Sequence, residues 1–538
     1  MFLRTKRFKN KDGSVREYLF IVASRWVNGK IKQKTIGCLG RKDILIKGGE
    51  IDKLVVKLNA YTQKVKAIDL AKDIDADWHK KYGIILVLRQ IWERLGFGNI
   101  FRRHLQKRKN KKNLAEAIFM LVANRLLMPF SELRVMQWKE EVYEPEWGKL
   151  TLSDLYRALD FLVENKEESE VEIFQKTANL FNQKLDLILF DTTSIRYWGE
   201  GKTDLLRYGY SKEKRGDLRQ LIVGILMSKE GIPVGHEVWP GNTSDMKAFL
   251  EILEKVKSKF QIDKIVWVCD RGMVSEENLK EAQRAGHEYI VGIKMRQLSE
   301  AEQKKLLDTG DMIKIHSDLF VKEVEVKGEG RYIVCYNPTE AAYEKRKRDF
   351  FKEILRKKVL ERTDKEWIMK NGYKKYIDID SGVIKMNEER LAKEEIFDGK
   401  WVLLTNTELP SREAALYYKS LWQIEASFRD LKHELEVNPI YHFTERRIRA
   451  HIFVCFLALV LKLTFKKWLE KIDKNLNYSE VFEAVKDIEA IQITAPHQRV
   501  IIRTEFPPKA HFAFKAVGMS PPPQIIKLEQ RYPHSAYV

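Results

Sequence analysis

The chain has 538 residues and carries 97 Lys and Arg against 77 Asp and Glu, a formal net charge of +20. Its hydrophobic fraction of 44% and its 26 Phe, 20 Tyr and 12 Trp exclude a basic disordered tail, and the length allows two or more domains with sizeable cores. A folded protein this basic suggests a polyanionic partner. Nucleic acid is the commonest such partner, although net charge alone also fits proteins that bind none.

The cysteines and the apolar segments indicate a cytoplasmic protein. Cys38, Cys269, Cys335 and Cys455 form no CxxC pair, so we expect small core residues in a reducing compartment. The longest apolar stretch, 452–463, is shorter than the roughly 20 residues that a membrane span needs. The expected location is therefore the cytoplasm, without a membrane partner.

The amino-terminal region 1–80 is expected to hold a β-hairpin followed by a linker. Residues 16–40 alternate around Asn28-Gly29, a pair that suits a type I′ turn. Such a turn joins two antiparallel strands directly.

The period changes in 81–184, where apolar residues recur three and four positions apart. This pattern predicts a helical domain for DNA binding or dimerisation. Within it, the cationic run 102–112 is either a solvated loop or a phosphate contact, and the sequence leaves both readings open.

After the helical domain the pattern indicates a mixed sheet covered by helices. The apolar run 185–191 ends in Asp191, and a meander of two further strands follows in 218–241. Capped helices then alternate with strands, one of which, 263–270, ends in Asp270. This order predicts an α/β fold with helices on the faces of the sheet.

Two aspartates at the ends of buried strands need a chemical reason. A carboxylate is costly to bury unless it is paired, neutralised or bound to a cation. If the two strands are neighbours, Asp191 and Asp270 face each other with like charge, and hard oxygen ligands of this kind suit Mg²⁺ or Mn²⁺. The alternative is that either residue caps the turn-like segment that it starts, DTTS or DRG.

The stretch YYKSLWQIEASFRDLK, residues 417–432, is expected to form one helix. Tyr418, Glu425 and Lys432 are spaced seven apart and so fall along one face, with Arg429 beside them. Glu425 and Arg429 are either an exposed i, i+4 pair or part of a polar stripe that faces a site. The apolar neighbours indicate a packed helix and favour the second reading, in which Glu425 is the third carboxylate of a two-metal site.

These segments resemble bacterial insertion-sequence transposases with an Asp, Asp, Glu triad on a ribonuclease H-like fold. The relevant branch carries a Tyr-x-x-Arg-x-x-x-Glu-x-x-x-x-x-x-Lys signature, and Tyr418, Glu425 and Lys432 match it here. Leu421 stands where the family usually has Arg, which puts one DNA contact in doubt, with Lys419 or Arg429 as the residue that would compensate.

The resemblance implies an α/β fold with a ribonuclease H-like mixed sheet formed by 185–300 and 402–470. It also implies a β-rich insertion, 301–401, which carries the basic helix 344–358. The remaining 471–538 is assigned to a C-terminal region.

The resemblance implies that Asp191, Asp270 and Glu425 are catalytic residues and the ligands of two Mg²⁺ ions, for which Mn²⁺ would substitute. Trp401 matches a tryptophan that stacks on a flipped base in some relatives, although a strand tryptophan is more often part of the core. The implied DNA contacts are Tyr418, Lys419, Arg429, Lys432, Trp401 and Arg271. Further candidates for phosphate contact lie in the helix expected at 445–463, at Arg446, Arg447 and Arg449.

The implied activity is that of a DNA transposase. It would bind the ends of its insertion sequence, cleave them by two-metal phosphodiester hydrolysis and join the freed 3′-OH ends to target DNA. The expected partners are double-stranded DNA, as terminal inverted repeats and as target, and a second copy of the chain in a DNA-bound homodimer at the bacterial nucleoid. Two alternatives are a metal-dependent DNA nuclease without strand transfer and an inactive transposase-derived DNA-binding protein, and the presence of all three acids weighs against the second.

Overall fold

The computed structural model divides into two compact units. Unit 1 comprises Met1–Lys81, Ile488–Phe506 and Pro522–Val538, and unit 2 comprises Tyr82–Asp487 and Pro507–Pro521. The structure describes residues 1–27, 30–59, 61, 75–106, 111–181, 187–210, 215–260, 265–270, 272–273, 275–297, 299, 303, 306–308, 310–326, 330–360, 377–380, 383–495 and 498–530.

Unit 1 begins with a three-stranded antiparallel sheet in the order β1-β2-β3. Its elements are β1 (Phe2–Lys9), β2 (Val15–Val27) and β3 (Lys30–Arg41), followed by α1 (Lys42–Lys47) and α2 (Glu50–Asn59). The expected hairpin corresponds to β2 and β3, while its turn at Asn28-Gly29 lies outside the described residues. Two predictions were incomplete or wrong here: β1 adds a strand, and Cys38 on β3 is exposed because this small sheet leaves much of its surface uncovered.

A second sheet of unit 1 joins distant parts of the chain in the order β18-β17-β16-β4. Its strands are β4 (Asp75–Lys81), β16 (Glu489–Ala495), β17 (Gln498–Arg503) and β18 (Ile525–Gln530). β4 and β16 are antiparallel neighbours, and the Glu489 carboxylate accepts from Lys81 at 2.6 Å and lies 3.0 Å from Nδ1 of His79. The C-terminal strands thus complete a sheet that β4 begins.

Unit 2 begins with a run of helices, as the apolar period predicts. They are α3 (Gly83–Arg94), α4 (Phe97–His104), α5 (Lys111–Leu127), α6 (Glu132–Trp138), α7 (Leu152–Glu164) and α8 (Lys166–Phe181), with short 3₁₀ turns at Lys139–Glu141 and Pro145–Lys149. α7 begins where Thr151 and Asp154 form a reciprocal capping box. In the cationic run 102–112, Arg103 and His104 contact Glu172 of α8, and residues 107–110 lie outside the described part.

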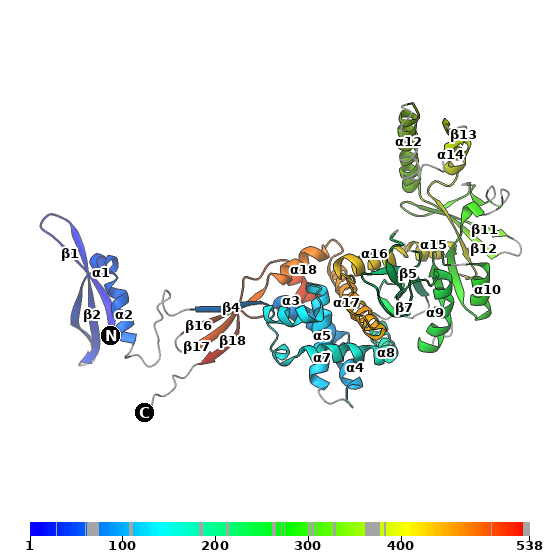
Figure 1. Ribbon diagram of the computed structural model, residues 1–538. Coiled ribbons are helices and arrows are strands. Elements are labelled where there is room, and N and C mark those ends of the chain that lie inside the picture. The colour runs from blue at the N-terminus through cyan, green and yellow to red at the C-terminus, as the bar shows by residue number, and fades with distance from the viewer. Residues whose placement is uncertain are drawn as a thin grey trace. The chain divides into compact units, whose positions relative to one another are not determined.

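The long helix α17 (Glu445–Ile472) is the shared core element of unit 2. It contacts α3, α5 and α7 on one side and β7 on the other (Figure 1). α18 (Tyr478–Lys486) and α19 (Ala510–Val517) follow it in the chain, and α19 packs against it. By length and composition α17 passes a test for membrane-spanning helices, but 89% of its most apolar window is buried inside the protein, as in the core helix of a folded domain.

A nine-stranded sheet fills the rest of unit 2, in the order β10-β11-β12-β15-β9-β8-β5-β6-β7. Its strands are β5 (Leu187–Tyr197), β6 (Arg219–Ser228), β7 (Pro233–Pro240), β8 (Val266–Cys269), β9 (Glu288–Gly292), β10 (Ile313–His316), β11 (Leu319–Val326), β12 (Gly330–Tyr336) and β15 (Lys400–Thr405). β5, β6 and β7 form an antiparallel meander, and β8 and β9 continue from β5 in parallel. The expected mixed α/β architecture is confirmed, and this strand order is consistent with the ribonuclease H-like fold.

The strands expected in a separate insertion extend this same sheet. β12 pairs with β15, which in turn pairs with β9, so β10, β11 and β12 form the far edge of the nine-stranded sheet. Between β12 and β15 the chain forms the basic helix α12 (Pro338–Leu360), the hairpin β13 (Ile377–Asp380) and β14 (Val383–Met386), and α14 (Glu388–Glu395). We expected a β-rich insertion at 301–401; backbone pairing instead joins its strands β10, β11 and β12 to the central sheet.

Helices cover both faces of the central strands. On one face α9 (Asp245–Phe260) and α10 (Glu276–Arg284) enclose an apolar cluster that includes Ile188, Phe190, Phe249 and Trp267. On the other face α15 (Ser411–Lys419) contacts β8 and β9, and α16 (Trp422–Arg429) contacts β5. A π-helical turn, Asp430–Glu434, then leads toward α17.

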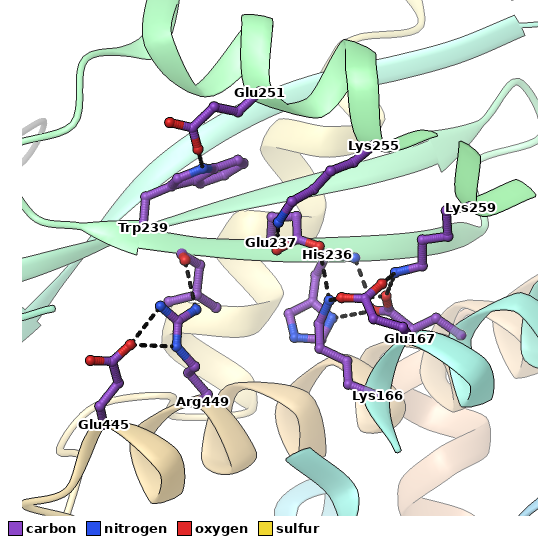
Figure 2. A network of polar contacts seen from close by, with 12 residues as sticks. Lys166, Glu167, His236, Glu237, Trp239, Glu251, Lys255, Lys259, Glu445 and Arg449 are labelled. Carbon is purple, nitrogen blue, oxygen red and sulfur yellow. Dashed lines mark hydrogen bonds and ion pairs between the residues drawn. The ribbon is translucent and has the colours of Figure 1, made fainter. Parts of the chain in front are cut away.

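A buried carboxylate links the helical part of unit 2 to the sheet. Glu170 of α8 has no exposed side-chain surface, and its carboxylate contacts Lys166, Lys259 of α9 and the ring of His236 on β7. Lys166 also binds Glu237, the residue after His236, at 3.0 Å (Figure 2). Burial opposes the charged form of Glu170, but Lys166, Lys259 and His236 outweigh it and hold the pKa of this carboxyl well below its usual range.

We expect Glu170→Gln to lower the free energy of unfolding by about 3–5 kcal/mol, because the change removes the fully buried carboxylate that Lys166, Lys259 and His236 share. Urea unfolding followed by circular dichroism measures the loss. Glu168→Gln is the matched control, since Glu168 lies exposed on the same helix, and should change stability by less than about 0.5 kcal/mol. Equal effects of the two substitutions would contradict the role of the network.

Candidate active site

Asp191 lies within β5 and not at its end, so the predicted strand boundary was wrong. β5 continues to Tyr197 because it pairs with β6 along its whole length. Ile188 and Phe190 point into the apolar cluster beneath α9, so strand alternation directs Asp191 to the opposite face. There the backbone N–H of Thr192 donates to Oδ1 of Asp191 at 2.7 Å.

Asp270 directly follows the last residue of β8, as predicted. β8 is the parallel neighbour of β5, and Leu189 pairs with Val268, so Asp191 and Asp270 each lie two residues beyond this pair. Burial raises the pKa of the Cys269 thiol well above its usual value, and the negative charges of Asp191 and Asp270 raise it further. Both carboxylates therefore act at the same end of the parallel pair.

The helix predicted over 417–432 is interrupted, so the prediction of one continuous helix was wrong. α15 and α16 are separated by a turn that begins at Ser420, whose hydroxyl donates to the carbonyl of Tyr417 at 2.6 Å. Side-chain bonds of this kind compete with the helical hydrogen bonds of the backbone. Tyr418 and Glu425 consequently belong to different helices.

Tyr418 contacts Asp270, the residue that follows β8. Its hydroxyl donates to Oδ1 of Asp270 at 3.0 Å. The ring lies against Gly292, the last residue of β9, where an added Cβ would come within 2.9 Å of Cζ of Tyr418. Glycine at this position therefore gives the tyrosine the room that it needs to contact Asp270.

Glu425 lies on α16, which packs against β5, the strand of Asp191. Ile424 and Phe428 are buried, whereas the side chain of Glu425 is exposed. Gln423 holds the start of the helix close to Gly231 in the turn between β6 and β7. The three predicted carboxylates thus come from two parallel strands and from one helix that contacts the first of these strands.

The π-helical turn after α16 is fixed by a buried lysine. Lys462 of α17 is 5% exposed and contacts Asp430 at 3.0 Å and also Glu434, the first and last residues of the turn. Burial raises the pKa of Asp430 even though Lys462 opposes the shift. This pairing orients the turn that carries Lys432, which is half-buried.

The other predicted DNA contacts fall into different environments. Lys419 and Arg429 are exposed at the ends of α15 and α16. Trp401 of β15 is half-buried, and its indole N–H has no hydrogen-bond partner among the residues that the structure describes. Strand alternation places Trp401 on the same face as Leu403, which pairs with Gly292 beneath Tyr418. Arg271 lies outside the described residues.

The arginines at the start of α17 bind the protein itself. Arg446 contacts Asp160 and Glu164 of α7, and Arg447 contacts Asp160. The guanidinium of Arg449 donates to a backbone carbonyl of β7 at 2.8 Å and pairs with Glu445 (Figure 2). In this structure they join α17 to its neighbours, which differs from the phosphate contacts that the sequence suggested.

The residues present fit a hard divalent cation. Asp191 and Asp270 supply oxygen ligands at one end of the parallel pair, and Mg²⁺ and Mn²⁺ prefer such ligands. Tyr418 donates a hydrogen bond to Asp270 and so helps to orient this carboxylate.

The sequence did not predict two features of the site. The contact of Tyr418 with Asp270 joins positions 148 residues apart, and no local pattern encodes it. The break at Ser420 depends on a side-chain bond to the backbone. A signal for the first did exist, because a glycine that ends an apolar strand, as Gly292 does, often marks a close approach of another group.

Two family models match the chain. The model of the transposase DDE domain matches residues 182–461, more than half of the chain, and the model of the IS1634 family transposase N-terminal domain matches residues 3–69. No curated protein sequence matches. Among solved structures, the chain is similar to the piggyBac transposase synaptic complex with hairpin DNA, determined by cryo-electron microscopy, at 8% identity and a TM-score of 0.38, over 75% of this chain and 79% of that one.

We expect Gly292→Ala to lower the free energy of unfolding by about 1–3 kcal/mol, because the new methyl group collides with the ring of Tyr418. In the Tyr418→Ala background the same substitution should cost almost nothing, so the two effects should not be additive. Urea unfolding of the single and double variants measures this coupling. Gly148→Ala is the control, since an added Cβ meets nothing within 4 Å there; additive effects of Gly292→Ala and Tyr418→Ala would contradict the contact.

Proposed function

The chain belongs to the DDE transposases, and from this premise we propose that Asp191, Asp270 and Glu425 form the metal-binding catalytic centre of a DNA transposase. The observation that supports this assignment best is the parallel pairing of β5 and β8, which places Asp191 and Asp270 at the same end of adjacent strands. α16 brings Glu425 to the strand of Asp191. The elements that carry the three carboxylates are thus neighbours, which supports the proposal.

The chemistry proposed for this centre is cleavage and joining of DNA strands. Two Mg²⁺ ions bound there, with Mn²⁺ as a substitute, would supply an activated water for hydrolysis and stabilise the leaving 3′ oxygen. Asp191, Asp270 and Glu425 would bind these ions as ionised carboxylates. Tyr418 would orient the Asp270 carboxylate, because its hydroxyl donates to Oδ1. The freed 3′-OH would then attack target DNA at the same centre.

The proposed substrate is double-stranded DNA, at the ends of the insertion sequence and at the target. Lys419, Arg429 and Lys432 follow Tyr418 along α15, α16 and the π-helical turn, and would contact phosphates near the carboxylates. The net charge of +20 supports binding to a polyanion. Trp401, on the face of the sheet that Tyr418 covers, would stack on an unpaired base.

We also propose that the DNA-bound form is a homodimer that holds the two ends of the element together. Arg271 remains a proposed DNA contact by its place next to Asp270 in the sequence. Leu421, which replaces the signature arginine, lies at the break between α15 and α16, with the exposed Lys419 and Arg429 on either side of it. These two residues would supply the positive charge that the signature arginine provides in the family.

Glu425→Gln should reduce both DNA cleavage and strand transfer by at least about 100-fold, because the amide removes a charged metal ligand. Asp191→Asn and Asp270→Asn should act in the same way. The assay uses labelled duplexes that carry the element's ends, purified full-length protein and Mg²⁺, with gel separation of cut and joined products. Glu413→Gln, an exposed substitution on α15, is the control and should retain activity.

The outcomes of this assay distinguish the alternatives. Cleavage without joining in the unmodified protein would indicate a nuclease, and DNA binding without cleavage would indicate an inactive derivative. Full activity of Glu425→Gln would remove Glu425 from the centre.

Arg429→Gln and Lys432→Gln should each weaken DNA binding regardless of sequence and reduce the slope of log affinity against log salt by about 1. Each substitution removes one proposed phosphate contact. Fluorescence anisotropy across a salt series measures the slopes. Lys467→Gln, on α17 and paired with Glu470, should leave the slope unchanged; equal slopes for all three variants would contradict the proposed contacts.

A further inference from the structure

A second group of metal-ligating side chains lies away from the three carboxylates. Glu132, His442 and His451 are buried, and one ligand atom from each lies within 4.8 Å of the others. They come from three separate elements: the first residue of α6, the loop before α17, and α17 itself. No local sequence pattern marks this group, because its members are far apart in the chain.

The surrounding contacts hold both imidazoles in place. Nε2 of His442 lies 3.1 Å from Oε1 of Glu132, and Nε2 of His451 donates to the carbonyl of Val437 at 2.9 Å. Nδ1 of His451 therefore keeps a lone pair. The hydroxyl of Tyr197, at the end of β5, donates to the backbone carbonyl of His442 at 3.1 Å. Backbone carbonyls that orient a histidine ring in this way are typical of metal sites.

The charge of this environment restricts what can bind. Arg125 lies close by, and its guanidinium donates to backbone carbonyls of Phe130 and Glu436. A dication beside Glu132 would leave net positive charge in the interior unless a second anion joins it, which a metal-bound hydroxide would supply. Cys455, one helical turn after His451, is buried, but its Sγ lies 3.8 Å from Nε2 of His451, the nitrogen that donates to Val437, and not at Nδ1.

We propose that Glu132, His442 and His451 bind one Zn²⁺ ion, with a hydroxide from bound water as the fourth ligand. Imidazole nitrogen and carboxylate oxygen are zinc ligands of proteins, and zinc held by three side chains takes an oxygen from solvent in its fourth position. This donor set differs from the all-oxygen set of Asp191, Asp270 and Glu425, which favours harder cations. The two centres would therefore select different metals.

The ion would fix the segment that connects the candidate active site to the core. The loop that carries Val437 and His442 follows the π-helical turn, which itself follows Glu425 on α16. A metal bound there would tie this loop to α6 and to α17. Its loss should loosen the loop without removing any of the three catalytic carboxylates.

The test uses the full-length chain, purified without a metal-binding tag and with Asp191→Asn, Asp270→Asn and Glu425→Gln in the background, so that those carboxylates bind no metal. Elemental mass spectrometry of this protein should find about one zinc ion per chain. Competition between the stripped protein and a chromogenic chelator measures Zn²⁺ affinity. His442→Gln and His451→Gln should each lower this affinity by more than about 100-fold, beyond the usual cost of losing an outer-sphere partner.

Two control variants separate a ligand role from general damage. His511→Gln removes an exposed histidine, and His287→Gln removes a buried one outside the group. Both should retain zinc affinity. A zinc affinity that is unchanged in His442→Gln and His451→Gln would overturn the proposal. A parent protein that binds no more zinc than these variants would overturn it as well.

Co²⁺ substitution in the parent protein supplies a readout that needs no variant to fold. An intense visible spectrum typical of tetrahedral cobalt, without a thiolate charge-transfer band, would support the three side-chain ligands. A thiolate charge-transfer band would overturn this donor set, because it would require a cysteine ligand. A weak spectrum typical of octahedral cobalt would overturn the site itself.

Discussion

A carboxylate without any exposed surface constrains how unit 2 can assemble. Glu170 is tolerable in the interior only while Lys166, Lys259 and His236 surround it, because an uncompensated buried charge costs several kcal/mol. These partners come from α8, α9 and β7. The meander β5-β6-β7, which includes the strand of Asp191, is therefore tied to α8, which precedes it in the chain, and to α9, which follows it.

Polar contacts also tie α17 to its neighbours. Lys462 binds both ends of the π-helical turn, Arg449 donates to the backbone of β7, and Arg446 pairs with acidic groups of α7. The apolar length of α17 packs between these contacts. One helix thus supports the segment of Glu425 and joins the amino-terminal helices to the sheet within one compact unit.

The sequence allowed the sheet to be predicted better than the helix that faces it. Buried strands are marked by apolar runs, so the neighbouring strands of Asp191 and Asp270 could be inferred from their lengths and order. Apolar spacing does not register the break at Ser420, where the hydroxyl donates to the carbonyl of Tyr417. The pairing of β12 with β15 and the contact of Tyr418 with Asp270 depend on distant segments, which local patterns do not encode.

The parallel pair of β5 and β8 lies in the interior of a sheet that continues on both sides, and this limits how the chain can vary. Side chains alternate along a strand, so inserting or deleting one residue in 187–191 or 266–270 would turn a carboxylate into the apolar layer beneath α9. The edge strand β10 has no buried residue and is free of this restriction. Lineages of this protein should therefore gain and lose residues near that edge while these two short segments keep their length.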